Sequence, residues 1–137
     1  MTESAMNPQT GHRWYTRPVI FVDDVNRALR FYVDRLGFKK AWHEGDGAGT
    51  VCQISRGECE IILCEDAARS GRARLFIELT SEGLAELRRE LAERYVPSTV
   101  SWWGSEVILV EDPDGNELLF PTSREHARSD PNTPRDG

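Results

Sequence analysis

The sequence predicts an α+β domain built from two paired βαβββ modules. Two observations lead to this fold class. The pattern of one strand, one helix and three strands occurs twice along the 137 residues. Near the end of the chain, Asp112-Pro113-Asp114-Gly115-Asn116 forms a tight-turn sequence between two apolar runs, which is typical of a β-hairpin. One module alone would leave one face of its sheet bare, so the two modules are expected to pair.

The first module begins with an apolar strand, Val19–Val22, and Asp24 follows at the position of a helix N-cap. Apolar residues at helical spacing predict one buried helix face, formed by Leu29, Tyr32, Val33 and Leu36. Gly37 is expected to end this helix. Three strands follow at residues 38–43, 49–54 and 58–64, separated by glycine-containing loops.

The second module repeats this order. A strand is predicted at residues 74–79, and Thr80 or Ser81 is expected to cap the next helix. The apolar face of that helix consists of Leu84, Leu87, Leu91 and Tyr95. The last three strands are predicted at residues 99–103, 106–111 and 117–120.

The length is sufficient for one domain, expected at residues 14–121, with module one at 17–65 and module two at 73–121. The polar segments 1–13 and 122–137 are expected to be mobile tails. The net charge of −6 argues against nucleic acid and anionic membranes as partners. No apolar segment has the length of a membrane span, and a cytoplasmic protein with three reduced cysteines is expected.

Two segments resemble one known family. They are the Asp112–Asn116 turn and the sequence VDDVNRALRFYVDRLGF at residues 22–38. Together they are similar to the vicinal-oxygen-chelate superfamily, which contains glyoxalase I, ring-cleaving dioxygenases, fosfomycin-resistance enzymes and bleomycin-resistance proteins. The resemblance covers residues 17–121, and it implies curved mixed sheets that enclose a cavity between the two modules.

The metalloenzymes of this superfamily bind a divalent cation through His or Glu side chains on equivalent strands. Aligned by motif, the corresponding positions here are Arg17, Ile62, Arg74 and Leu119. Two cations and two aliphatic side chains do not suit a cation site. Of the three histidines, His43 is the one inside the expected domain. The sequence therefore predicts no metal, no cofactor and no catalytic residue.

The resemblance is strongest to the bleomycin-resistance branch, on Arg17-Pro18, Arg56-Gly57 and Trp103-Gly104. It implies a homodimer that binds a small molecule, such as a bleomycin-like antibiotic, in aromatic-lined clefts between subunits. The dimer is expected to exchange an arm that contains Trp14. The candidate ligand-binding residues are Trp42, His43, Glu60, Ile62, Trp103 and Glu106. This sequence departs from the branch after Trp103-Gly104, where it has Glu106-Val107 in place of an Arg-Glu pair.

Two other functions stay open at this point. The chain could be a lyase, isomerase or dioxygenase that uses either metal-free acid–base chemistry or a non-standard metal set formed by His43, Glu60, Glu78 and Glu106. It could also be an interaction module whose own side chains fill the cavity. Each candidate residue also has an ordinary explanation: a tryptophan can fill the core, a strand glutamate can face solvent, and His43 can be a partly exposed polar residue.

Overall fold

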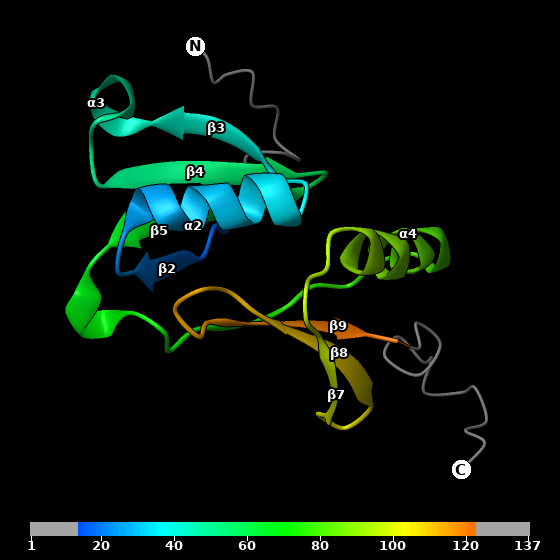
Figure 1. Cartoon of the computed structure of the whole chain (residues 1–137). Helices are drawn as coiled ribbons and strands as arrows, with labels where there is room; N and C mark the ends of the chain where they lie inside the picture. Colours follow the sequence, from blue (N-terminus) through cyan, green and yellow to red (C-terminus); the bar gives the residue numbers. More distant parts are fainter. Residues whose placement is uncertain (1–13, 123–137) are drawn as a thin grey trace.

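The computed structural model describes residues 14–122, which form two modules, each with a four-stranded mixed sheet (Figure 1). The first module comprises β2 (Val19–Val22), α2 (Val25–Arg30), the π-helical turn η1 (Phe31–Arg35), β3 (Lys39–His43), α3 (Glu44–Gly47), β4 (Val51–Arg56) and β5 (Cys59–Glu65). After the short helix η2 (Ala67–Arg69), the second module comprises β6 (Arg74–Phe76), α4 (Ser81–Glu93), β7 (Thr99–Trp102), β8 (Glu106–Glu111) and β9 (Glu117–Pro121). The predicted tails lie outside the described residues, except for Thr122.

The two sheets have the same topology. Their strand orders are β2-β5-β4-β3 and β6-β9-β8-β7. In each sheet the first strand runs parallel to the last strand of its own module, and the other neighbours are antiparallel. This repeat confirms the predicted α+β fold of two βαβββ modules. Among residues 14–122, no helix is long and apolar enough to cross a membrane.

Helix α2 begins where the sequence predicts. The Asp24 carboxylate accepts hydrogen bonds from the backbone amides of Asn26 and Arg27, at 2.9 and 3.1 Å. These bonds, that from Arg27 foremost, lower the pKa of Asp24, because they stabilise the charged form. The helical segment ends with η1 at Arg35, and Gly37 follows with a φ of 74°, which confirms its predicted role in ending the helix.

The buried face of this helix differs partly from the prediction. The buried residues are Val25, Ala28, Tyr32 and Leu36. Leu29 and Val33, which were expected on this face, are only half-buried. The turn at η1 is wider than an α-helical turn, so an ideal 3.6-residue period does not describe the whole segment.

Helix α4 has the predicted cap but a different end. Thr80 Oγ1 accepts a hydrogen bond from the Gly83 amide at 3.0 Å, as expected for an N-cap. The assignment of Tyr95 to the buried face is wrong, since its side chain is exposed. The helix ends at Glu93, and Tyr95 has a φ of 54° that turns the chain. Val96 therefore takes the buried position.

The Asp112–Asn116 turn is a buried joint between the modules. Tyr32 Oη donates to Asp112 Oδ2 at 3.0 Å, and Asn116 Nδ2 donates to the same carboxylate oxygen at 2.9 Å. Asn116 also donates to the Phe21 carbonyl at 3.1 Å and accepts from the Ala73 amide at 2.9 Å. A turn with these bonds fixes both module one and the strand that opens module two. A single hydrophobic core continues across both modules.

Candidate ligand-binding site

Each sheet has one face covered by a helix and one face that we call its open face. Directly paired residues on neighbouring strands project from the same face of a sheet. Ile62 of β5 pairs with Val19 on one side and Gln53 on the other, and Gln53 pairs with Trp42. The intervening residues Ile61 and Leu63 belong to the core beneath α2. The open face of the first sheet consists of Val19, Phe21, Lys39, Trp42, Val51, Gln53, Ser55, Glu60, Ile62 and Cys64.

Three of the six predicted ligand-binding residues, Trp42, Glu60 and Ile62, share this open face. His43 does not, because successive residues of a strand alternate between faces and His43 pairs with the buried Cys52. The His43 ring instead lies with Nε2 2.8 Å from the Gly49 carbonyl oxygen. The role of all four residues in ligand binding stays a prediction.

Glu60 has an unusual environment on this face. Its Oε1 atom is buried and has no hydrogen-bond partner among residues 14–122. A buried carboxylate oxygen without a partner is energetically unfavourable, so a cation or a hydrogen-bond donor brought to this position would stabilise it. Glu60 is thus a candidate contact for a cationic group.

The open face of the second sheet carries an aromatic cluster. Phe76 pairs with Leu119, and Leu119 pairs with Leu109. Trp103 lies just beyond β7, and its ring meets the Phe76 ring edge-on at 5.6 Å between centroids. The guanidinium of Arg74 lies over the Trp103 ring at 6.0 Å and donates to Glu117 at 3.0 Å.

Glu106, the sixth predicted residue, lies away from this cluster. It pairs with Trp102 and projects on the same side as the core residue Ile108, two positions further along β8. Its Oε1 accepts a hydrogen bond from Thr122 Oγ1 at 2.9 Å. Glu106 and Trp102 therefore project from the α4 side of the sheet, whereas Trp103, beyond the end of β7, contacts Phe76 on the open face. The roles of Glu106 and Trp103 in ligand binding stay predictions.

The residues at the family's metal-ligand positions are engaged elsewhere. Arg17 donates to Gln53, and Arg74 donates to Glu117. In the alternative set, His43 and Glu60 project from opposite faces of the first sheet and Glu106 lies on the second sheet. Glu78 follows β6 and lines the cavity between the modules. Within residues 14–122, no three or more His, Cys, Asp or Glu side chains are grouped so that they could hold a metal ion. The side chains present at these positions do not fit the metal site of the superfamily's metalloenzymes.

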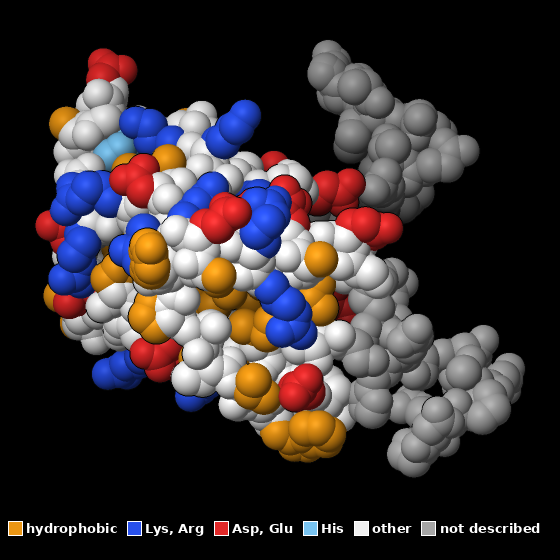
Figure 2. All heavy atoms as spheres, turned by 45° about the vertical axis from the view of Figure 1, so that its right-hand side comes forward, with side chains coloured by type: hydrophobic (Ala, Val, Ile, Leu, Met, Phe, Trp, Pro, Cys, Tyr) orange, Lys and Arg blue, Asp and Glu red, His pale blue; other side chains and the backbone are white. Residues whose placement is uncertain are grey.

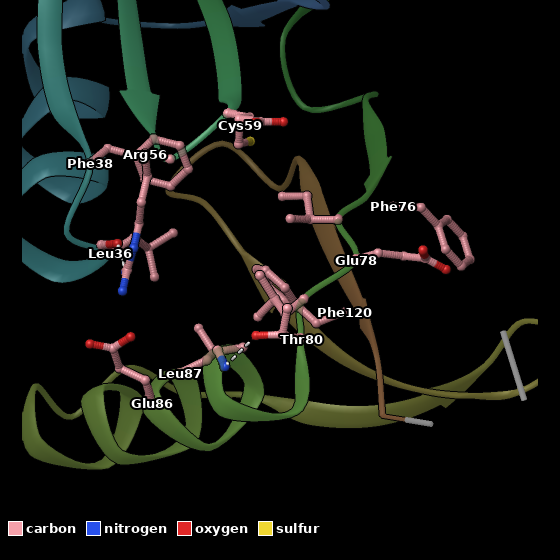
Figure 3. Close-up of a pocket in the computed structure, with 15 residues that line it drawn as sticks. Leu36, Phe38, Arg56, Cys59, Phe76, Glu78, Thr80, Glu86, Leu87 and Phe120 are labelled. Atoms are coloured by element: carbon pink, nitrogen blue, oxygen red, sulfur yellow. Dashed lines mark hydrogen bonds between the residues drawn. The ribbon is translucent and has the colours of Figure 1, made fainter. Parts of the chain in front are cut away.

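A cavity of about 620 Å³ lies between the two modules (Figure 3). Phe38 and Arg56 approach it from the first module, and Leu87 and Phe120 face them from the second. Figure 2, which is turned toward this side, shows hydrophobic side chains in the hollow between the modules and charged side chains around it. None of the six predicted ligand-binding residues lines this cavity.

Ionic and polar contacts hold Arg56 in place at the edge of the cavity. Arg56 binds both carboxylate oxygens of Glu90, at 2.9 and 3.1 Å, and also donates to the Leu36 carbonyl. The hydrogen bond from Arg56 lowers the pKa of Glu90. Burial raises the pKa of Cys59, which also lines the cavity, so its thiol stays protonated at neutral pH and is a poor nucleophile.

Sequence reasoning missed two features of these surfaces. Gln53 occupies the centre of the first open face, but a lone glutamine in a strand gives no sequence signal. Phe38 was predicted as the first residue of a strand and Arg56 as part of the segment between two strands, and neither was predicted to line a cavity. In both cases the relevant partners lie in distant segments of the chain.

Comparison with known proteins places these features in context. The model of the Glyoxalase/Bleomycin resistance protein/Dioxygenase superfamily matches residues 14–120. Bleomycin resistance proteins of Geobacillus stearothermophilus and Staphylococcus aureus are 29% identical to this chain over 125 residues, which cover 75% of this chain and 92% of theirs.

Solved structures show the same fold. The bleomycin-binding protein of bleomycin-producing Streptomyces verticillus, complexed with copper(II)-bleomycin, is 22% identical, with a TM-score of 0.62 over 81% of this chain and 97% of that one. An antibiotic-binding protein from a Streptomyces species is 23% identical, with a TM-score of 0.62 over 80% and 96%. Lactoylglutathione lyase from Agrobacterium tumefaciens is 16% identical, with a TM-score of 0.60 over 80% and 94%. At these identities the likeness concerns the fold alone.

Proposed function

Since this chain belongs to the Glyoxalase/Bleomycin resistance protein/Dioxygenase superfamily, we propose that it is a metal-free small-molecule-binding protein. It sequesters an aromatic or cationic compound, and a glycopeptide antibiotic such as bleomycin is the first candidate. The observation that carries this proposal is the presence of exposed aromatic side chains on the open faces of both sheets.

These side chains are too exposed to serve mainly as core. The exposed fractions are 42% for Trp42, 50% for Phe76 and 44% for Trp103. Aromatic rings presented on a sheet face suit stacking against a planar ligand. The unpartnered Oε1 of Glu60 adds a place for a cationic group. The names of the relatives, bleomycin resistance protein and bleomycin-binding protein, support the same class of ligand.

We further propose that the protein is a cytoplasmic homodimer whose clefts form between open faces of different subunits. Trp14 and Tyr15 are 95% and 70% exposed, and they precede Pro18, which holds its own backbone φ near an extended value. An aromatic segment followed by a rigid proline suits an arm that packs on a second copy. The three free cysteines are compatible with a reducing compartment.

An enzyme of the glyoxalase or dioxygenase type is not favoured by any specific observation. Its Lewis-acid chemistry needs about three protein ligands on one metal ion. The donor side chains described above do not converge in that way. The likeness to lactoylglutathione lyase concerns the fold alone.

The proposal is tested by titrating tryptophan fluorescence of the purified protein with bleomycin, with and without EDTA. We expect saturable binding that EDTA does not change. Binding that is lost with EDTA and restored by a divalent metal would contradict the metal-free assignment. Stoichiometric Zn, Ni, Fe or Mn in the purified protein would do the same.

Light scattering at tens of micromolar tests the dimer separately. We expect a mass twice that of the 15.6 kDa chain. A monomeric mass would remove both the arm exchange and the intersubunit cleft. Binding of bleomycin by such a monomer would still leave the small-molecule function in place.

A further inference from the structure

Gln53 holds two functional side chains together at the centre of the first open face. Its side chain is buried, with an exposed fraction of 5%. Its Oε1 accepts a hydrogen bond from Arg17 Nη1 at 2.6 Å and another from Trp42 Nε1 at 3.1 Å. Because one amide oxygen receives both bonds, the guanidinium and the edge of the indole ring are fixed side by side.

This arrangement leaves Arg17 charged and Trp42 accessible. A neutral glutamine orients the guanidinium but does not neutralise it, and Arg17 forms no ion pair with a carboxylate of residues 14–122. The guanidinium has five N–H donors, so the bond to Gln53 leaves others for a ligand. Trp42 keeps 42% of its surface exposed to solvent.

We propose that Arg17, Gln53 and Trp42 form a subsite for a planar aromatic compound that carries an acidic group. The aromatic ring stacks on Trp42, and a carboxylate of the ligand pairs with Arg17. Gln53 is a positioning residue that fixes both partners before the ligand arrives. This inference rests on the proposed small-molecule function and specifies the ligand class of the first sheet.

The charges elsewhere on the protein make this preference diagnostic. The net charge of −6 repels anions, and Glu60 projects from the same open face. Neither feature favours an acidic ligand. A preference for an acid over a matched amine must therefore come from a local cation. Lys39 also projects from this face, but Arg17 is the cation that Gln53 holds beside Trp42.

The test compares anthracene-9-carboxylate with 9-(aminomethyl)anthracene, which share one ring system and have opposite charges. Binding of each is measured by fluorescence titration at low ionic strength. We expect the wild-type protein to bind the carboxylate about tenfold more tightly than the amine, a difference typical of one charge-assisted contact. The preference should weaken as salt is added, because the contact is partly exposed.

Two variants locate the subsite, and a third is the control. Arg17→Gln should abolish the preference for the carboxylate. Gln53→Glu keeps an oxygen acceptor for Arg17 and Trp42 but adds a negative charge beside Arg17, so the preference should disappear or reverse. Arg88→Gln removes the same charge from the exposed side of α4 and should leave the preference unchanged. Circular dichroism and urea titration establish that each variant is folded.

Three results would overturn the inference. The first is a carboxylate preference that survives Arg17→Gln. If Gln53→Glu does not fold, the Arg17→Gln variant tests the inference by itself. The second is wild-type protein that binds both probes equally or prefers the amine; small-molecule binding would then stand without the acidic subsite. The third is the absence of binding of either probe, which would also remove support for the proposed function.

Discussion

The joint between the modules and the open faces of the sheets differ in how far their side chains find partners within the chain. At the joint, Asp112 and Asn116 are buried, and their side chains bond to backbone and side-chain groups of both modules. On the open faces, Trp42 and Trp103 stay exposed, and Glu60 has a buried oxygen without a partner among the described residues. The joint is thus complete within the chain, whereas the open faces have unused binding capacity.

The largest expected effect concerns the joint. Asn116→Ala removes three hydrogen bonds and leaves buried polar groups without partners, so we expect the free energy of unfolding to fall by roughly 3–5 kcal/mol. Urea denaturation measures this change. Asn26→Ala, at an exposed position of α2, is the control and should change stability by no more than about 0.5 kcal/mol. A loss as small as that of the control would mean that the joint does not hold the modules together.

The second prediction concerns the open face of the second sheet. Trp103→Ala should weaken the binding of an aromatic ligand by about 1–3 kcal/mol, because a stacking surface and its buried area are lost. Trp102→Ala is the matched control, since Trp102 projects from the opposite side of the sheet and is 69% exposed. Fluorescence titration with bleomycin, or with anthracene-9-carboxylate, measures both variants. If Trp102 is the more sensitive residue, the ligand binds on the α4 side and the distinction between the faces fails.

The smallest effect concerns Glu90, which links α4 to Arg56 of the first module. Because the hydrogen bond from Arg56 lowers the folded-state pKa of Glu90, ionised Glu90 stabilises the fold above the ordinary pKa of a glutamate. This stabilisation is lost as the pH falls through the folded-state pKa. Glu90→Gln should therefore reduce stability by about 1 kcal/mol at neutral pH, and the difference from wild type should shrink in acid.

Urea midpoints measured at neutral and acidic pH test this pH dependence. Glu93→Gln is the control, since the Glu93 pair with Arg89 is exposed on both sides. A Glu90→Gln deficit that is equal at both pH values would show that the ion pair with Arg56 does not stabilise the contact between the modules.

Much of the fold could be predicted from local sequence signals. Asp24 and Thr80 act as N-caps, and Gly37 ends the first helix, as their residue types indicate. Tyr95 shows the limit of such signals, because its spacing fits the apolar helical face although the helix has already ended. The candidate site was predicted less completely. Trp42, Glu60 and Ile62 share one face, but His43 and Glu106 lie elsewhere.

The sequence by itself determined the order of the elements, the helix caps, the turn at Asp112–Asn116 and the family to which the chain belongs, because these depend on residues close together in the chain. The tertiary structure decided which side chains meet. Arg17 and Gln53 are 36 positions apart, and Tyr32 and Asp112 are 80 apart. Strand register and module packing bring these pairs together, and a shift of one residue in register would move a strand side chain to the other face of its sheet.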